Sequence, residues 1–234
     1  PRFEKLFFLS NLIATRAGER AHYDRVVRAA GFRTATVPEH LRFEGEADFF
    51  PAGAVHLLTH GRLEEQRFVA HLGVPPWKRV YGFRTDARAL SFLAPLVAPR
   101  PVLRVELVLE AHYHGDTALC AFGPQREYLL AWKPAIEAES WERLRETFGE
   151  HLLELGDDDA ARYAANAFTY TPCGQHGATR ESFLFLPGGV SDALLAQLRE
   201  RGVTPVTIDV SEFLKKGGGS VKCMIGDLGP VEGV

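Results

Sequence analysis

The sequence lacks any long hydrophobic segment. None of its apolar runs approaches the roughly 18 to 20 residues that a transmembrane helix needs. The chain also opens without the basic and apolar regions of a signal peptide. We therefore expect a cytoplasmic protein with no membrane partner.

Cysteine is also scarce. The chain has three cysteines, Cys120, Cys173 and Cys223, an odd number at wide spacing. This pattern argues against a disulfide framework and against a CxxC metal knuckle. We therefore expect at least one thiol to be free for chemistry.

The chain has no large excess of either charge. It carries 27 lysines and arginines against 30 aspartates and glutamates, a net charge of −3 at pH 7. The basic residues are scattered rather than gathered along one face, whereas a nucleic-acid-binding surface needs a basic patch. We expect no nucleic-acid partner.

Short apolar runs alternate with amphipathic helical stretches, and this pattern is typical of an α/β fold. With 234 residues, 46% of them hydrophobic, the chain has enough apolar material for a sizeable core. The expected strands are Lys5–Leu9, Val102–Leu109, Thr117–Phe122, Ser182–Leu186 and Thr204–Asp209. The expected helices are Arg20–Ala30, Asp86–Val97, Ser140–Leu152, Asp157–Ala165 and Ser191–Arg201.

A strand and helix unit recurs along the chain. Ser182–Asp209 reads as strand, helix, capping glycine and strand, and a weaker copy spans Glu137–Tyr170. Pro51–Trp77, which holds several glycines and prolines, is interpreted as a loop excursion or a small insertion. Since no low-complexity linker divides the chain, we expect a single domain over residues 1–234.

Three consecutive glycines, Gly217 to Gly219, precede Cys223. Glycines cost backbone entropy on folding, so such a run suggests positive φ angles or a group that approaches the backbone closely. A flexible turn is the alternative. A phosphate loop is disfavoured because the GxxxxGK[ST] spacing is missing.

His112, His114 and Asp116 alternate along Ala111–Thr117. On a strand these three side chains would share one face, since side chains alternate with period two. Such a trio could hold zinc, although the longer metallohydrolase pattern continues with another histidine where Thr117 stands. The remaining alternative is one core histidine and two surface groups.

Two further segments carry charged groups. Phe43–Asp48 is an acidic turn that contains Glu44 and Asp48. It indicates a binding site only if the substrate is a cation. In Tyr81–Asp86, Thr85 or Asp86 could cap the following helix. Arg84, in the same segment, is a candidate clamp for a substrate carboxylate because its guanidinium matches that group bidentately.

Taken together and in this order, FEGEAD, YGFRTD, YHGDTALC, the stretch Ala165–Phe168 and SEFLKKGGGSVKCM resemble the guanidino-modifying enzymes of the pentein superfamily. That superfamily includes arginine deiminase, agmatine deiminase, dimethylarginine dimethylaminohydrolase, glycine amidinotransferase and arginine dihydrolase. The resemblance covers roughly Phe43 to Leu228. Phe83 stands where deiminases tend to carry a glutamate, which argues against a strict arginine deiminase.

The resemblance implies a pseudo-fivefold α/β propeller of ββαβ modules whose first module is short or missing before Pro1. It implies that Cys223 is the nucleophile and His114 the general acid/base. The expected substrate-binding residues are Asp48, Asp116, Arg84 and Glu44, with Arg84 matching an arginine that holds the substrate α-carboxylate in some members.

The expected activity is a hydrolase that attacks the guanidinium carbon of arginine or an arginine derivative through a covalent Cys amidino-thioether. We expect no cofactor and no metal, and a small-molecule guanidino substrate as the partner; a homo-oligomer is compatible with the sequence. An amidinotransferase on the same scaffold, a metal-dependent hydrolase using His112, His114 and Asp116, and a non-catalytic pentein binding protein remain as alternatives.

Overall fold

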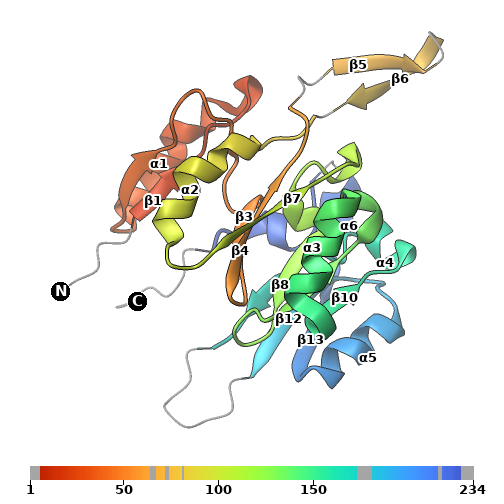
Figure 1. Cartoon of the computed structure of the whole chain (residues 1–234). Helices are drawn as coiled ribbons and strands as arrows, with labels where there is room; N and C mark the ends of the chain where they lie inside the picture. The colour runs from red at the N-terminus through yellow and green to blue at the C-terminus, as the bar shows by residue number, and fades with distance from the viewer. Residues whose placement is uncertain are drawn as a thin grey trace. The chain divides into compact units, whose positions relative to one another are not determined.

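A computed structural model describes residues 6–63, 67–71, 74–80, 82–172, 181–215 and 218–227. The chain divides into two compact units. Unit 1 comprises Pro1–Phe50 and Ala54–Gly115, and unit 2 comprises Pro51–Gly53 and Asp116–Val234. Helices and small sheets occur in both units, which confirms the mixed α/β class (Figure 1). The single domain over the whole chain stays a prediction.

Unit 1 begins with a parallel strand pair joined by a helix. β1 (Leu6–Leu9) pairs with β2 (Arg33–Thr36), and η1 (Ala14–Arg16) and α1 (Glu19–Ala29) lie between them in the chain. A three-stranded sheet follows, in the order β3 (Phe49–Ala52), β4 (Val55–His60) and β7 (Val102–Glu106). η2 (Ala87–Ala89) and α2 (Leu90–Val97) precede β7, which is parallel to β4.

Unit 2 contains two more three-stranded sheets. The first is formed by β8 (Leu119–Phe122), β9 (Tyr128–Ala131) and β10 (Leu152–Glu154), with η5 (Lys133–Ala135), α3 (Ala138–Phe148) and η6 (Gly149–His151) before β10. The second is formed by β11 (Phe168–Tyr170), β12 (Ser182–Pro187) and β13 (Val203–Ile208), with α5 (Asp192–Glu200) before β13. α4 (Asp157–Ala161), α6 (Ser211–Lys215) and η7 (Lys222–Met224) complete the unit.

All three of these sheets follow one plan. Two strands adjacent in the chain pair with each other, a helix follows, and the third strand runs parallel to the second. The first two strands are antiparallel in both sheets of unit 2. The β1-α1-β2 segment repeats the later part of the same plan. The predicted recurrence of a strand and helix unit is therefore confirmed, but the copy expected over Glu137–Tyr170 is instead β8-β9-α3-β10, from Leu119 to Glu154. The unit β3-β4-α2-β7 is a further copy that the sequence did not indicate.

Each unit has its own buried apolar cluster. In unit 1, a cluster that includes Phe43 and Leu58 holds the acidic turn against α2. In unit 2, all four residues of β8 are buried, as expected for a strand covered on both faces. α5 contributes Leu194 and Leu198 to the unit 2 cluster. The Ser191 hydroxyl caps α5 by accepting a hydrogen bond from the Leu194 amide at 3.2 Å.

Several predicted elements are shorter in the structure. The strand predicted over Val102–Leu109 ends at Glu106, and the strand predicted over Thr117–Phe122 begins only at Leu119. Between these strands the chain forms two 3₁₀ turns, η3 (Glu110–His112) and η4 (Gly115–Thr117). The helix predicted over Asp157–Ala165 ends at Ala161. Tyr163 then has a φ of 58°, which an α-helix cannot continue through.

Pro51–Trp77 is not a loop excursion, because β4 and parts of β3 and β6 fall within it, as does all of β5. β5 (Arg67–His71) and β6 (Val74–Val80) form an antiparallel sheet of their own, which fits a small insertion. Among the helices of the described ranges, none is long and apolar enough to cross a membrane.

Candidate functional site

The acidic turn of unit 1 is built around Gly45. Its φ of 96° lies in the left-handed region, and its carbonyl accepts hydrogen bonds from the amides of Asp48 and Phe49 at 3.1 and 3.0 Å. The turn directs the carboxylates of Glu44 and Asp48 inward, where the side chain of each is only 1% exposed. The sequence thus forms a pair of buried carboxylates within six residues.

Asp48 uses both of its oxygens in hydrogen bonds. Oδ1 accepts from the Thr59 hydroxyl at 2.8 Å and from the Gly115 amide at 2.9 Å. Oδ2 accepts from the Thr85 hydroxyl at 2.6 Å and lies 3.1 Å from His114 Nδ1. Burial acts to raise the pKa of Asp48, but His114 and these donors outweigh it and hold the pKa below its usual value. The carboxylate is therefore ionised and fixed in place.

Glu44 approaches His114 from the other side of the imidazole. Its Oε2 lies 3.2 Å from His114 Nε2, and its Oε1 accepts from the Ile13 amide at 3.2 Å and from Arg84 Nη1 at 3.4 Å. Burial acts to raise the pKa of Glu44, but the interactions with His114 and Arg84 lower it below the usual range. Glu44 is thus a second buried anion beside the same ring.

The imidazole of His114 consequently has a carboxylate at each nitrogen. Asp48 faces Nδ1 and Glu44 faces Nε2. A neutral imidazole can donate from only one nitrogen, whereas the imidazolium donates from both. The surroundings therefore favour a protonated, rigidly oriented His114, as suits a group that delivers a proton.

Arg84 is buried in unit 1, with its side chain 5% exposed. Its Nε donates to the Gly82 carbonyl at 3.3 Å, and its guanidinium lies over the Tyr113 ring at 4.7 Å. All of these contacts of Arg84, including the one with Glu44, are with groups of the protein. Its role as a clamp for a substrate carboxylate therefore stays a prediction. Asp86 caps η2, as expected, by accepting from the Arg88 amide at 2.8 Å.

Cys223 lies in unit 2 on the loop that ends in η7. Asn166, which is fully buried, holds this loop: its Oδ1 accepts from the amides of Ser220 at 2.6 Å and Cys223 at 3.2 Å. Its Nδ2 donates to the Asp116 carbonyl at 3.1 Å. One side chain therefore links the backbone of Cys223 to the backbone of Asp116.

The thiol of Cys223 is protonated at neutral pH in this environment. Although part of the residue is exposed, its Sγ lies against Gly219 and Asn166. Burial, followed by the charge of the buried Asp116, raises the pKa of Cys223 to about 11. Hydrogen bonds from Asn166 and Gly219 and the charge of Lys222 act in the opposite direction. A cation next to Asp116 would remove part of this barrier to ionisation.

The prediction that His112, His114 and Asp116 share one strand face is wrong. These residues lie in and between the 3₁₀ turns η3 and η4, because the Gly115 amide bonds to Asp48 and Gly115 packs directly on Thr59, where a Cβ would overlap the threonine side chain. His112 and His114 belong to unit 1 and Asp116 to unit 2. Across the residues that the structure describes, no three His, Cys, Asp or Glu side chains are grouped as a metal site.

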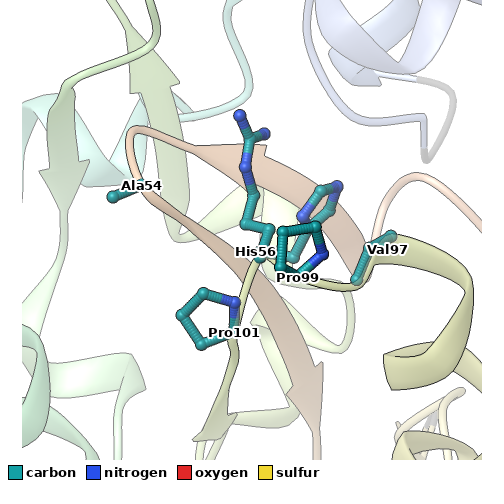
Figure 2. A pocket seen from close by; sticks show the side chains of 6 residues that line it. Ala54, His56, Val97, Pro99 and Pro101 are labelled. Carbon is teal, nitrogen blue, oxygen red and sulfur yellow. The ribbon is translucent and has the colours of Figure 1, made fainter.

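A separate open depression lies in unit 1. Figure 2 shows its lining side chains, which come from Ala54, His56, Val97, Pro99, Arg100 and Pro101. His56 stacks on Phe49 at 5.2 Å, and burial together with Arg100 lowers the pKa of His56. None of the site residues predicted from the sequence lines this depression, so it is distinct from the carboxylate and histidine cluster.

Three residues of the two clusters were not assigned to the site from the sequence. Thr59 and Thr85 hold Asp48, and Asn166 holds the cysteine loop. Thr85 stands in a segment that the sequence singled out, but as a helix cap. Asn166 lies in the stretch Ala165–Phe168 that carried part of the resemblance, which was the one signal available for it.

Comparisons with known proteins agree with this geometry. The chain is 32% identical to N(G),N(G)-dimethylarginine dimethylaminohydrolase of Mycobacterium tuberculosis over 92% of its own length, and it spans 58% of that relative. The N-terminal domain of ArgZ, an arginine dihydrolase of the cyanobacterial ornithine-ammonia cycle, has a similar fold, with a TM-score of 0.73 at 23% identity over 95% of this chain and 70% of that one.

A dimethylarginine dimethylaminohydrolase from Pseudomonas aeruginosa is similar with a TM-score of 0.58 at 18% identity, over 92% of this chain and 67% of that one. No family model matches the chain. The three similar proteins all belong to one superfamily. Over 92 to 95% of its length the chain is similar to members of the guanidino-modifying pentein superfamily.

Proposed function

We propose that this protein is a hydrolase that acts on the guanidinium carbon of arginine or an arginine derivative, with Cys223 as the nucleophile. The observation that carries the proposal is that Asn166 ties Cys223 to the segment of the buried Asp116. Burial and then the charge of Asp116 raise the pKa of the Cys223 thiol. A buried anion beside a nucleophile suits a cationic substrate, because the cation both pairs with the anion and stabilises the thiolate.

The first step is activation of the thiol. A guanidinium bound at Asp116 neutralises the charge that disfavours the thiolate, so the pKa of Cys223 falls when the substrate binds. Charge-assisted hydrogen bonds from the planar guanidinium to the carboxylate also fix its orientation. The nucleophile thus becomes reactive mainly in the presence of the substrate.

The second step is attack at the guanidinium carbon. The sulfur of Cys223 forms a bond to this carbon and gives a tetrahedral adduct. The adduct collapses by breaking one C–N bond, and the departing ammonia or amine takes a proton from His114. An amidino-thioether remains on Cys223, and His114 is left neutral between Glu44 and Asp48.

The third step is hydrolysis of the thioether. His114 removes a proton from water, the water oxygen bonds to the carbon, and the C–S bond breaks to release a ureido product and the thiol. A related structure supports this scheme, since the N-terminal domain of ArgZ was captured with a covalently bonded reaction intermediate.

An amidinotransferase is the second candidate, because an acceptor amine could replace the water in the third step. The names of the similar proteins, a dimethylaminohydrolase and an arginine dihydrolase, favour hydrolysis. A non-catalytic pentein is disfavoured because Cys223, His114 and their carboxylates are all present. The metallohydrolase alternative is disfavoured because His112, His114 and Asp116 do not share a strand face.

Within this proposal, Asp116 pairs with the guanidinium and Arg84 holds the substrate carboxylate. We assign Glu44 and Asp48 to the substrate as well as to His114, whose protonated form they favour. We further propose that the repeated ββαβ units form the pseudo-fivefold propeller of the superfamily. Each of these assignments follows from the family resemblance and from the charges described above.

The direct test is to incubate the protein with arginine, agmatine, methylated arginines and succinylarginine while measuring ureido product and ammonia. We expect turnover of at least one of these compounds and its complete loss in Cys223→Ser. Cys120→Ala, at a buried cysteine of the same unit, is the control and should retain turnover. Activity that survives Cys223→Ser would rule out Cys223 as the nucleophile.

A further inference from the structure

Asn166 joins three separate parts of unit 2. Its side chain accepts from the Ser220 and Cys223 amides and donates to the Asp116 carbonyl. Its own carbonyl accepts from the Lys222 amide at 3.1 Å. Four hydrogen bonds therefore connect one buried residue to the cysteine loop and to the segment that carries Asp116.

The loop is shaped to sit on this asparagine. A Cβ at Gly219 would overlap Cys223 Sγ and lie 2.9 Å from Asn166 Oδ1. Only a glycine at this position lets the thiol and the amide oxygen come so close. This close approach explains one of the three glycines before Cys223, and it makes the position of the thiol depend on Asn166.

Asn166 is itself held by a rigid part of the unit. Its amide donates to the Tyr163 carbonyl at 2.9 Å. Its neighbours Ala165 and Ala167 are buried in the apolar cluster of unit 2, and β11 begins directly after Ala167. A side chain anchored in a packed core can hold its partners with little loss of entropy on substrate binding.

We propose that Asn166 is a positioning residue that sets the separation and orientation of the Cys223 thiol and the Asp116 carboxylate. The proposal rests on the proposed function, since that function needs a guanidinium carbon to meet the sulfur while the carboxylate holds its nitrogens. A misplacement of about 1 Å between reacting groups can cost on the order of 100-fold in rate. Asn166 achieves this placement through backbone atoms and does not react.

The first experiment compares Asn166→Ala with Ser191→Ala. Ser191 is an exposed residue of unit 2 that is likewise held by several hydrogen bonds, since the buried Asp159 accepts from its amide and hydroxyl, both at 2.7 Å. Both variants should unfold at lower temperature than the wild type. We expect kcat of Asn166→Ala to fall about 10- to 100-fold, whereas kcat of Ser191→Ala should stay within about twofold. Equal kcat values in the two variants would show that Asn166 is merely structural.

The second experiment needs no turnover. Asn166→Asp has the same shape and keeps both acceptor bonds, but it adds a negative charge beside the thiol and loses the donor to Asp116. Alkylation of Cys223 by iodoacetamide at pH 8, followed by mass spectrometry of its peptide, should be about three- to tenfold slower. The alternative is that Asn166 only keeps the loop closed. The loop would then loosen in Asn166→Asp and expose the thiol. Alkylation of the variant as fast as that of the wild type, or faster, would therefore overturn the proposal.

The two readouts separate this proposal from the proposed function. If no guanidino compound is turned over by the wild type, the hydrolase assignment fails, while the alkylation rates still decide whether Asn166 controls the thiol. If turnover is found and alkylation of Asn166→Asp is unchanged, the hydrolase assignment stands and the positioning role fails. The aspartate variant also decides the question if the alanine variant does not fold.

Discussion

The Cys223 thiol is the residue whose behaviour depends most directly on its neighbours. Since the charge of Asp116 raises the pKa of Cys223, Asp116→Asn should lower it. More thiolate is then present at pH 8, and alkylation of Cys223 should be about three- to tenfold faster than in the wild type. Alkylation followed by peptide mass spectrometry measures this rate. As a control, Asp192→Asn, at an exposed carboxylate of α5, should leave the alkylation rate unchanged. A slower rate in Asp116→Asn would contradict the effect of Asp116 on the pKa of Cys223.

Asp48 gives a second prediction, on the pH dependence of stability. Its pKa in the folded state lies below its unfolded value of about 4, so on acidification the unfolded state binds the proton first. The stabilisation is therefore complete above about pH 5 and is lost as the pH falls through the folded-state pKa. Asp48→Asn, which removes the charge, should cost about 2 to 4 kcal/mol at pH 7.

Urea unfolding of the wild type and Asp48→Asn between pH 7 and pH 3 measures this difference. The gap in unfolding free energy should be constant from pH 7 to about pH 5 and should narrow below pH 4 as the wild-type carboxylate becomes protonated. Asp86→Asn, at a carboxylate that caps η2 through Arg88, is a comparison variant outside the His114 contacts. A gap that widens on acidification would show that the sign of the Asp48 effect is wrong.

At the scale of single residues, the sequence singled out the candidate reactive groups but not the groups that hold them. Cys223 and His114 stood out because thiol and imidazole chemistry is recognisable in a motif. Asn166 bonds to amides 54 and 57 positions further along the chain, and no local pattern encodes such a contact. Asp48 was expected to bind the substrate, yet its oxygens also contact Thr59, Thr85 and His114, which only the folded turn could reveal.

At the scale of elements, hydrophobic patterning identified five of the six α-helices of the described residues to within a few residues, but only five of their thirteen strands. α5 was predicted over Ser191–Arg201 and spans Asp192–Glu200, because both of its ends have local signals: the Ser191 hydroxyl caps the first turn, and Gly202, with a φ of 72°, follows the last. The two predicted strands on either side of the His114 segment are too long: β7 ends at Glu106, and Thr117 belongs to η4. The cause is tertiary: Gly115 packs on Thr59 and its amide bonds to Asp48, residues more than 50 positions earlier.

The cap of α5 provides a prediction at this scale. Ser191→Ala removes the acceptor for the Leu194 amide and leaves Asp159 Oδ2 without its hydroxyl donor. We expect a loss of about 1 to 2 kcal/mol in unfolding free energy. The upper end of this range applies if the buried Asp159 carboxylate finds no other donor. Chemical denaturation measures it. Asp192→Ala, an exposed residue one position later, should cost only a few tenths of a kcal/mol, and equal losses would contradict the capping role.

At the scale of the whole molecule, the two units each contribute part of the chemistry that the proposed hydrolase needs. Unit 1 holds His114 between Glu44 and Asp48, and unit 2 holds Cys223 with Asp116. The superfamily could be recognised from the sequence because its motifs keep their order along the chain. The division into units could not, since composition shows no linker at Gly115 and the division depends on contacts between distant segments.

Ligand binding should therefore stabilise the whole chain when its substrate is present but cannot be consumed. In Cys223→Ser, a guanidino substrate at about 100 times its Kd should add about 2.7 kcal/mol to the unfolding free energy. For a chain of this length that corresponds to a rise of about 5 to 10 °C in Tm.

Thermal unfolding of Cys223→Ser with a series of ligands tests this expectation and identifies the substrate class. Arginine and dimethylarginines carry both a guanidinium and an α-carboxylate, agmatine lacks the carboxylate, and ornithine lacks the guanidinium. If Arg84 holds the carboxylate, agmatine should stabilise less than arginine, and in Arg84→Ala the two should become equal. Because the proposed site selects a guanidinium through Asp116, ornithine should have little effect, and a rise in Tm with ornithine equal to that with arginine would refute the proposed recognition.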